Sequence, residues 1–479
     1  MKAKDFDIKL PAFVDRTVHI NDYGAKPYAY SYEDSNNNAA AINRAITYVS
    51  EKGGGVVVIP EGIWYTAPIE IKSDVCLKLM KNAVLKFSKD YRQYPLIKTS
   101  YEGQDCIRTI SPITADHAIN IGITGEGTID GSGDMWRPVK QFKLTEKQWN
   151  NLLSKSQYVI QTKEGGIWFP TETSFKGNEA NIQFDADKCI MTDDTLSEAN
   201  VSPDEEKALK EAAPYYDFYR PVMVSLRYCK RVLLDGVTFM NSPAWNIHPY
   251  FCKNLTVRNV KINNPYYAQN GDGIDIESCN KVHIHDCNFE TGDDAICVKS
   301  GKNAVARQIE GPCENVYIHD CIVNEGHGGF VIGSEMSRGV KDVLVEKCTF
   351  IGTDVGVRMK SAVGRGGTVE NIEIRDINMT NIKGEAIILS MSYVLNLLNR
   401  NEEINSIDES DIPHFTNITM DNINCMGAKI PVKVDPVSTR NDTIKNIKIS
   451  NSNFAASGDC VINGDKDQVE FINTEFVKF

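Results

Sequence analysis

Four short segments between residues 270 and 361 carry the side chains of this 479-residue sequence that could do chemistry. They span residues 272–278, 294–300, 328–334 and 355–361. Each ends in Ser after an alternating run rich in β-branched residues, and this pattern predicts a short strand. If the segments stack as neighbouring strands of one parallel sheet, equivalent residues lie about 4.8 Å apart.

Alignment of the segments on their final Ser gathers charged and titratable side chains into one patch. Asp272 and Asp294 share one column of this alignment. Asp293 and His327 share the column before it. The whole patch holds three carboxylates, one imidazole and two cations, namely Asp272, Asp293, Asp294, His327, Arg358 and Lys360. Function is therefore expected at this patch.

The three carboxylates favour general acid–base chemistry. A single Asp in a Gly-rich turn often bonds only its own backbone, and any one of these residues could do so. Three in register are better explained by a site, because crowded like charges raise the pKa of at least one member. One carboxyl group can then be a protonated acid while the others stay ionised. Two carboxyl groups on opposite sides of a glycosidic bond are what glycoside hydrolysis requires.

The cations and the His suit an acidic ligand. Arg358 and Lys360 are two residues apart and point the same way from one strand. Alone they would be read as a solvated edge, but beside the acids they predict a clamp for a sugar carboxylate, which Arg binds through its planar fork. His327 has Gly on both sides, so it is either an ordinary loop residue or a ring that faces a ligand or tunes a nearby Asp.

Three more side chains are weaker candidates. Tyr393 closes a strand in the next repeat and is either a platform for sugar stacking or a rim aromatic. Trp245 is more often a core residue than a ligand contact. His248 lies one repeat before Asp272 and could line a further subsite.

A repeated template predicts the elements that position these residues. After residue 220 a line such as Cys279-Asn-Lys-Val-His-Ile-His recurs at intervals from 23 residues (229 to 252) to 46 residues (369 to 415). Each unit holds two or three short strands of period two, and helices between strands would need longer units. The sequence therefore predicts an all-β fold, a right-handed parallel β-helix whose longer units contain loops.

The flanking segments complete one predicted domain over residues 1–479. Residues 37–50 have apolar residues at helical spacing and stop at three Gly, which predicts a helix that caps the end of the repeat core. Residues 138–219 interrupt the repeat with helix-like segments near 145–153 and from 202. We expect an insertion on the binding face within the domain.

Composition limits the partners. The net charge of −12 argues against nucleic acid and anionic membrane surfaces, and no apolar run is long enough to span a bilayer. The protein is periplasmic or secreted if a signal peptide has been removed, and a cytoplasmic location is also open. A monomer is expected, because a capped β-helix needs no partner. The 13 Cys recur at repeat phases without metal-site spacing, so we expect buried thiols rather than disulfides.

Four ordered motifs resemble a known family. They are Asn270-Gly-Asp272, Gly292-Asp-Asp294, Gly326-His-Gly328 and Arg358-Met-Lys360. They are similar to the Asn-Thr-Asp, Gly-Asp-Asp, Gly-His-Gly and Arg-Ile-Lys signatures of the polygalacturonase family of pectin-degrading glycoside hydrolases. Gly271 replaces Thr and Met359 replaces Ile, and neither change removes a reacting group.

The resemblance implies inverting, single-displacement hydrolysis of α-1,4-linked galacturonate in pectin, with no metal or other cofactor. Asp293 would be the general acid, and Asp272 and Asp294 would hold and activate the water. His327 would support the protonation state of the acid. The resemblance implies that Arg358, Lys360 and Tyr393 bind the substrate. Asn270, in the first motif, and His248 are further candidates for substrate binding. An inverting acid–base pair needs about 6.5–9.5 Å between its carboxyl groups.

Within the family, the insertion over residues 138–219 resembles the longer exo-acting bacterial members. Inserted loops that close one end of the cleft would favour cleavage from a chain end, so a galacturonidase is expected. An endo-polygalacturonase and a rhamnogalacturonan hydrolase are the alternatives, although the Arg358–Lys360 pair suits a galacturonate on the leaving side.

Two interpretations of the function, from other classes of protein, stay open. A β-helical pectate lyase would bind Ca²⁺ through the clustered Asp residues, but the ordered His and Arg-x-Lys motifs would have no role in it. A non-catalytic polysaccharide-binding β-helix would need no complete set of three Asp.

Overall fold

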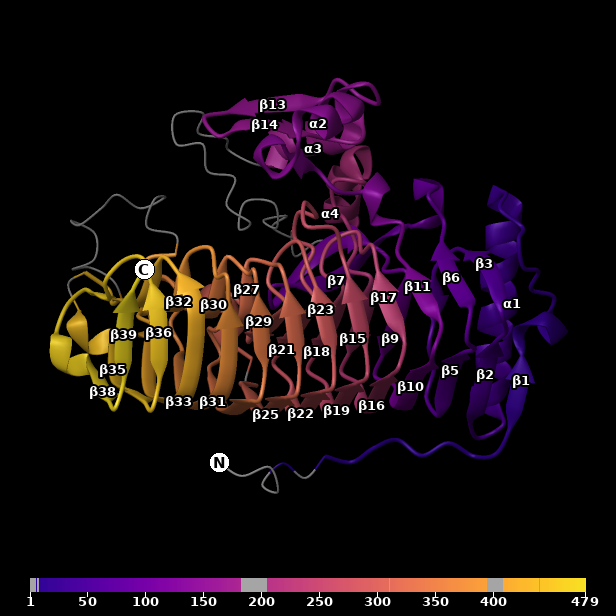
Figure 1. Cartoon of the computed structure of the whole chain (residues 1–479). Coiled ribbons are helices and arrows are strands. Elements are labelled where there is room, and N and C mark those ends of the chain that lie inside the picture. The colour runs from indigo at the N-terminus through magenta and orange to yellow at the C-terminus, as the bar shows by residue number, and fades with distance from the viewer. Residues whose placement is uncertain (1–5, 7, 182–204, 310, 394–407, 439) are drawn as a thin grey trace.

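The computed structural model describes the chain except for residues 1–5, 7, 182–204, 310, 394–407 and 439. Its strands wind into one long coil whose successive turns stack side by side, with helix α1 (Tyr32–Glu51) over the N-terminal end (Figure 1). Strands of adjacent turns pair in parallel throughout the coil. The predicted parallel β-helix is confirmed.

One face of the coil is an 11-stranded parallel sheet, and this face carries the predicted site. In spatial order from the N-terminal end its strands are β4 (Ile69–Glu70), β9 (Ile113–Asp116), β15 (Val224–Arg227), β18 (Ile247–Tyr250), β21 (Ile274–Glu277), β24 (Ile296–Lys299), β27 (Gly328–Ile332), β30 (Val355–Lys360), β32 (Glu385–Ser390), β34 (Ile430–Asp435) and β37 (Val461–Ile462).

The other two faces join into a 23-stranded sheet, because the long strands β31 and β33 run through both. One ladder contains β1 (Thr17–His19), β2 (Gly55–Ile59), β5 (Val75–Leu79), β10 (Ile119–Gly125), β16 (Lys230–Asp235), β19 (Lys253–Arg258), β22 (Asn280–His285), β25 (Cys313–His319), β28 (Val340–Glu346), β31 (Thr368–Thr380), β33 (His414–Ala428), β35 (Ile444–Ser450) and β38 (Val469–Ile472). The shorter ladder contains β3 (Gly62–Thr66), β6 (Ala83–Phe87), β11 (Thr128–Asp130), β17 (Thr238–Met240), β20 (Lys261–Asn263), β23 (Asn288–Glu290), β26 (Ile322–Asn324), β29 (Thr349–Ile351), β36 (Asn453–Ala456) and β39 (Glu475–Lys478).

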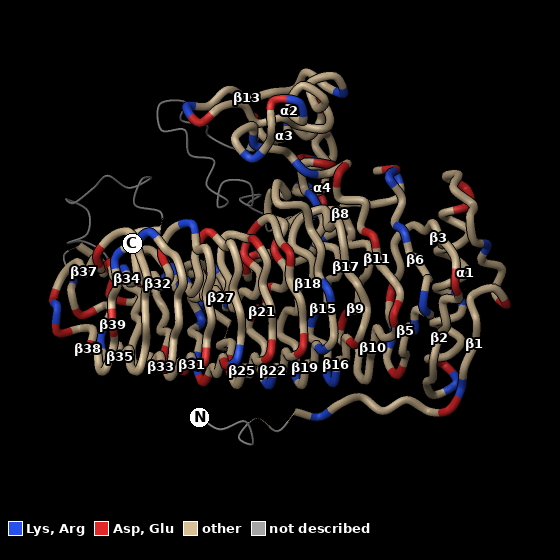
Figure 2. The backbone as a smooth tube through the Cα atoms, viewed as in Figure 1, with Lys and Arg blue, Asp and Glu red and all other residues tan. Residues whose placement is uncertain are grey.

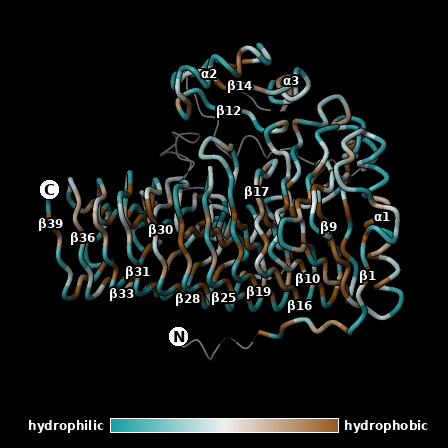
Figure 3. The backbone as a smooth tube through the Cα atoms, turned by 45° about the vertical axis from the view of Figure 1, so that its right-hand side comes forward, coloured by the Kyte–Doolittle hydropathy of each residue, from teal (hydrophilic) through white to brown (hydrophobic). Residues whose placement is uncertain are grey.

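The repeated template explains this coil. Its fourth residue always points inward, so that Val282, Val316 and Val343 pair in register from turn to turn, and all three are fully buried. Hydrophobic stretches accordingly follow the strands of each turn, whereas the insertion and many turns are hydrophilic (Figure 3). The core is thus a set of apolar columns that run along the axis of the coil.

The recurrent Asn of the template marks a backbone bend. Its third residue has a positive φ in every repeat, for example +57° at Asn315 and +56° at Asn371. Asn tolerates this left-handed conformation better than most residues, because its short polar side chain can bond the local backbone. The column therefore reflects the geometry of one corner of the coil.

The cysteines occupy similar columns. Within the described residues, twelve Cys are free thiols and eleven of them are buried, while Cys189 lies outside the described part of the chain. Cys252 and Cys279 lie in successive turns, and the Cys252 amide contacts the Cys279 sulfur at 3.3 Å. Buried thiols in register, as predicted, fill space as small apolar residues do.

Helix α1 covers the end of the coil and is longer than the predicted helix over residues 37–50. It begins after Ser31, whose side chain accepts from the Asp34 amide while the Asp34 carboxylate accepts from Ser31 in return. This capping box satisfies the first turn and extends the helix toward its N-terminus. One side of the helix, including Ile42 and Ile46, is buried against the first strands.

The described parts of the interruption, residues 138–181 and 205–219, form a small lobe beside the site-bearing face (Figure 1). It contains α2 (Glu146–Leu153), close to the predicted helix, α3 (Glu172–Asn181), α4 (Glu205–Ala212) and a sheet of β12 (Val139–Lys140), β13 (Val159–Thr162) and β14 (Gly165–Trp168). Residues 202–204, where the second helix was expected to open, lie outside the described residues.

A hairpin that the sequence did not reveal lies next to this lobe. It consists of β7 (Leu96–Tyr101) and β8 (Gln104–Thr109), and helix α4 packs against it. A short helix, α5 (Asn303–Arg307), follows β24. No helix in the described residues is both long and apolar enough to cross a membrane.

Candidate active site

Strand register brings the predicted residues together. Val298 pairs with Ile332 and Ile332 with Met359, so the final Ser residues of the four segments are equivalent, as the alignment assumed. The acids lie in the turns just before β21 and β24, where the backbone leaves one face for the next. Several acidic segments meet at the upper turns between β18 and β27 in Figure 2.

The three carboxylates form one buried cluster. One oxygen from each of Asp272, Asp293 and Asp294 lies within 4.8 Å of the other two, and none of the three residues is more than 4% exposed. Each also has a buried oxygen without a hydrogen-bond partner among the described residues: Oδ1 of Asp272, Oδ2 of Asp293 and Oδ1 of Asp294. Buried polar atoms are normally paired, so these three oxygens indicate a place for a polar ligand. The same cluster has the spacing to hold a cation.

His327 is joined to the acids and to the insertion. Its Nδ1 lies 3.1 Å from Asp293 Oδ1, and Lys143 Nζ lies 3.0 Å from its Nε2. An ammonium group can only donate, so Nε2 accepts and the ring proton is on Nδ1, from which it is donated to Asp293. Lys143 also donates to the Gly292 carbonyl at 2.9 Å. The lysine therefore sets the orientation and the tautomer of the ring.

The two cations of β30 contact the same cluster. Lys360 Nζ donates to Asp294 Oδ2 at 2.8 Å, and Arg358 Nη1 lies 3.9 Å from Asp294 Oδ1. Both cations lie over the ring of Tyr393, at 4.7 Å for Lys360 and 5.4 Å for Arg358. Although burial opposes charge on Lys360, the Asp294 carboxylate raises its pKa above the ordinary value, so the group stays an ammonium.

The remaining predicted residues lie in different settings. Asn270 lines the pocket above the acids, and its Oδ1 accepts from Arg220 Nη2 at 2.6 Å. His248 is only 1% exposed and bonds Glu277 Oε2 at 2.8 Å, with its ring edge against Trp245. His248 thus packs behind Trp245 and is not among the residues that line the pocket above the acids.

Three charged pocket-lining residues, Lys299, Glu335 and Glu102, were not predicted. Lys299 and Glu335 form a buried ion pair at 2.7 Å, and Glu102 pairs at 3.2 Å with Lys302, which lies outside the lining. The sequence held a signal for Lys299, because it precedes its Ser by one residue and so shares the column of Lys360. Glu102 carried no such signal, since the hairpin that delivers it lies outside the repeat.

The hairpin closes one end of this site. Tyr101, at the tip of β7, stacks on Trp245 with ring centroids 4.1 Å apart, and both side chains are at least 95% buried. Arg108 lies over the other face of Tyr101 at 3.8 Å. The opposite end is open: a cavity of about 350 Å³ there is lined by His327, Asp354, Arg358 and Lys383 among others.

The acids differ in their preference for a proton. Burial, followed by the charges of Asp275, Asp293 and Asp294, raises the pKa of Asp272 well above its ordinary value. Burial also acts to raise the pKa of Asp293, but His327, Lys143 and Lys360 outweigh it and lower that pKa below the ordinary range. In the ligand-free protein Asp272 is therefore the proton carrier of the cluster, and Asp293 is ionised.

Comparison with known proteins identifies the family of this chain. A model of the family described as glycosyl hydrolases family 28 matches residues 217–476, more than half of the chain. The chain belongs to this family. The family predicted from the four motifs is thereby confirmed, and the matched region contains all of the predicted site residues but neither the hairpin nor most of the insertion.

Two relatives of this chain are named as polygalacturonate-cleaving enzymes. The chain is 27% identical over 356 residues to a probable polygalacturonase of Vitis vinifera. The alignment covers 72% of this chain and 58% of that protein. It is 27% identical over 394 residues to an exo-poly-α-D-galacturonosidase of Dickeya chrysanthemi. This alignment covers 80% of this chain and 58% of that protein. The chain thus spans somewhat over half of the length of these relatives.

Solved structures resemble the whole family 28 chain. A hyperthermoactive exopolygalacturonase from Thermotoga maritima is 28% identical with a TM-score of 0.73, covering 98% of this chain and 94% of the other. A family 28 exopolygalacturonase from Yersinia enterocolitica, at 22% identity and a TM-score of 0.64, shares the fold.

Opposite pKa shifts predict opposite effects of two neutral substitutions on stability. The raised pKa of Asp272 means that the unfolded chain loses this proton at a lower pH than the folded chain, so the stability of the fold falls as pH rises above the ordinary value of 3.8. Asp272→Asn should therefore raise the midpoint of thermal unfolding by about 2 °C or more at pH 7, and the gain should shrink toward pH 4.

Asp293→Asn is the matched comparison. The lowered pKa of Asp293 contributes stability above its ordinary pKa, and this contribution is lost as pH falls. Its substitution should lower the unfolding midpoint by a similar amount at pH 7 and at pH 4, because the contribution is lost only as pH falls below the ordinary value of 3.8. Scanning calorimetry of both variants across this range is the measurement, and equal shifts for the two variants would contradict the assigned proton positions.

Lys143→Met should change the pH dependence of hydrolysis. The positive charge of Lys143 lowers the pKa of Asp293, so its removal raises that pKa. The limb of the pH profile of kcat/KM that reports Asp293 should move to higher pH. Lys143→Arg keeps the charge and should leave the profile in place, and identical profiles for all three proteins would exclude this role of the lysine.

Proposed function

We propose that this family 28 chain hydrolyses α-1,4-linked galacturonate in pectic oligosaccharides, and that it acts from a chain end. The observation that carries the proposal is the cluster of three buried carboxylates with unpaired oxygens beside a cationic pair. Acid–base chemistry at a glycosidic bond uses the carboxylates, and a sugar carboxylate suits the cations.

In this proposal Asp293 protonates the leaving oxygen, and Asp272 and Asp294 hold and activate the attacking water. The protonation of Asp272 depends on that of Asp293, because one carboxylate oxygen of each lies within 4.8 Å of the other. A proton held by Asp272 in the free protein is therefore available within the cluster when substrate binds. His327, fixed by Lys143, orients Asp293 for this transfer.

Substrate contacts follow from the two ends of the site. Arg358 and Lys360 bind the carboxylate of the sugar beyond the cleaved bond, on the side where the cavity is open. Tyr393 provides an aromatic face beside both cations. Asn270 binds the sugar at the closed side, where it lines the pocket.

The closed end supports exo action. A polymer threaded through the site would have to pass the stacked Tyr101 and Trp245, which block the direction toward β15. Only a chain terminus fits beside such a wall, whereas the remainder of the chain leaves through the open end. The names of the Dickeya and Thermotoga relatives are consistent with this mode of cleavage.

Product analysis over time tests the reaction and its mode. With polygalacturonic acid and trigalacturonate, monogalacturonate alone should appear early. Asp293→Asn should lower kcat by about 10³-fold or more, because a general acid contributes on this order. Asp286→Asn, which removes an exposed carboxylate elsewhere on the coil, should leave kcat unchanged.

Other product patterns would change the assignment. An early ladder of oligomers would exclude exo action, and activity only on a rhamnose-alternating backbone would identify a rhamnogalacturonan hydrolase. An unsaturated, ultraviolet-absorbing product that disappears with a chelator would identify a lyase.

The first anomer released tests the stereochemistry. Proton NMR at early times should show the β-anomer, as inversion at an α-linkage requires. The test matters because the nearest carboxylate oxygens, within 4.8 Å of each other, are closer than the roughly 6.5–9.5 Å expected of an inverting pair. Early release of the α-anomer would instead establish retention.

A further inference from the structure

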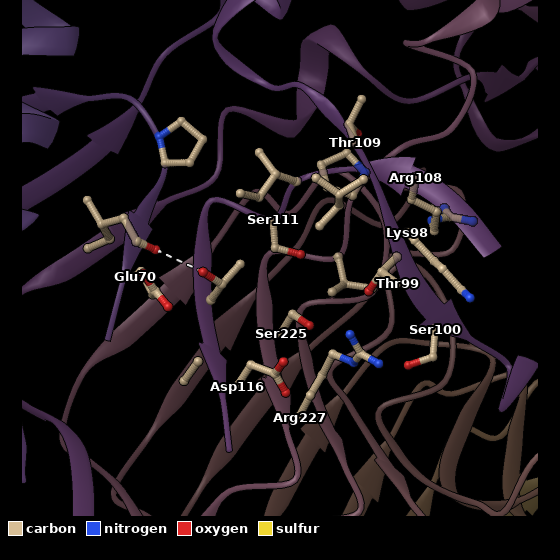
Figure 4. Close-up of a pocket in the computed structure, with 18 of the residues that line it drawn as sticks. Glu70, Lys98, Thr99, Ser100, Arg108, Thr109, Ser111, Asp116, Ser225 and Arg227 are labelled. Atoms are coloured by element: carbon tan, nitrogen blue, oxygen red, sulfur yellow. Dashed lines mark hydrogen bonds between the residues drawn. The ribbon is translucent and has the colours of Figure 1, made fainter. Parts of the chain in front are cut away.

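A second cavity lies on the same face of the β-helix, beyond the hairpin wall. Its volume is about 560 Å³, within the range of small-molecule sites. Strands β4, β9 and β15 form its floor, and the β7–β8 hairpin borders it (Figure 4). None of the predicted catalytic residues lines it.

The wall separates the two sites. Tyr101 and Trp245 are stacked between them, and Arg108 is held against this wall by Tyr101 and by a 2.7 Å hydrogen bond from its Nε to the Arg220 carbonyl. Arg220 in turn donates to Asn270 beside the acids. The face is continuous from β4 to β37, so the hairpin divides one long surface into two chambers.

The outer chamber holds polar groups that lack partners. Among the described residues, the buried Nε of Arg227 on β15 has no hydrogen-bond partner, and the guanidinium lies 5.7 Å from the centroid of the Tyr228 ring. Ser100 on β7 is 5% exposed, and its Oγ also has no hydrogen-bond partner. Figure 4 shows both side chains on the same side of the cavity. Unsatisfied buried donors are costly, so their convergence indicates a ligand that accepts hydrogen bonds.

The chemistry of the lining identifies the class of ligand. An Arg guanidinium presents a planar fork that matches a carboxylate. Ser225 lies beside Arg227 on the floor, and Glu70 and Asp116 offer acceptors for sugar hydroxyl groups. Asp116 forms its ion pair with His117, at 2.9 Å, rather than with Arg227. A compact molecule with one carboxylate and several hydroxyls satisfies all of these groups.

We infer that this cavity is a second, non-catalytic binding site for a sugar acid of the galacturonate type, whose carboxylate is held by Arg227 and Ser100. The choice of sugar rests on the proposed function, whereas the site itself rests on the unpaired groups. The sugar acid comes either from the released monosaccharide or from a unit of the substrate chain.

Binding stoichiometry tests the inference. Calorimetric titration of the wild-type chain with monogalacturonate should give two sites, and titration of Asp293→Asn with trigalacturonate distinguishes binding of a chain from binding of the product alone. Arg227→Met, which keeps an apolar side chain of similar length, should abolish one site. Its kcat/KM for trigalacturonate should stay within about twofold of wild type, because Arg227 lies outside the catalytic pocket.

Two further variants make the result decisive. Lys98→Glu places a carboxylate on the exposed part of the lining and should weaken the second site at least fivefold. Lys230→Met removes an exposed cation outside the cavity and should preserve both sites.

Three outcomes would overturn the inference: a single site in the wild type, two sites in both Arg227→Met and Lys98→Glu, or a loss of hydrolysis above tenfold in Arg227→Met. The last would mean that the cavity belongs to the catalytic cleft. Hydrolysis without a second site would refute this inference alone, and an Arg227-dependent site without hydrolysis would refute the proposed function alone.

Discussion

The parallel register between successive turns of the coil is the constraint on which this structure depends. Backbone hydrogen bonds fix each strand against the next, so that residues at equivalent template positions stack in columns. Apolar columns form the core, and Asn residues with a positive φ form a further column at the third position of the template. Where the column holds carboxylates, at Asp272 and Asp294, the same register brings like charges within 4.8 Å of each other. The fold thus supplies the stability that this repulsion reduces.

That repulsion is distributed unevenly around the cluster. Cations approach it from one side, where Lys360 neutralises Asp294 and the Lys143–His327 pair keeps Asp293 ionised. Within the described part of the chain, the buried Oδ1 of Asp272 has no hydrogen-bond partner, and burial makes Asp272 the member that keeps a proton. Asp residues of one cluster therefore differ in acid strength because their surroundings differ. Acid–base catalysis uses such a difference.

Elements outside the repeat decide what reaches the cluster. The hairpin brings Tyr101 against Trp245 and divides the long face, and the insertion brings Lys143 to His327. Both additions therefore shape the surroundings of the acids without any change in the repeat itself.

The sequence by itself determined the β-helix and the columns, because a template of period-two strands repeats often enough to define its register. It therefore also located Asp272, Asp293, Asp294, His327 and the two cations, which lie on the template. Only the tertiary structure decided the role of Lys143, 184 residues from its partner, the wall at Tyr101 and the enclosure of His248. Those contacts join segments that share no repeat, and no local pattern records which distant backbone will lie beside them.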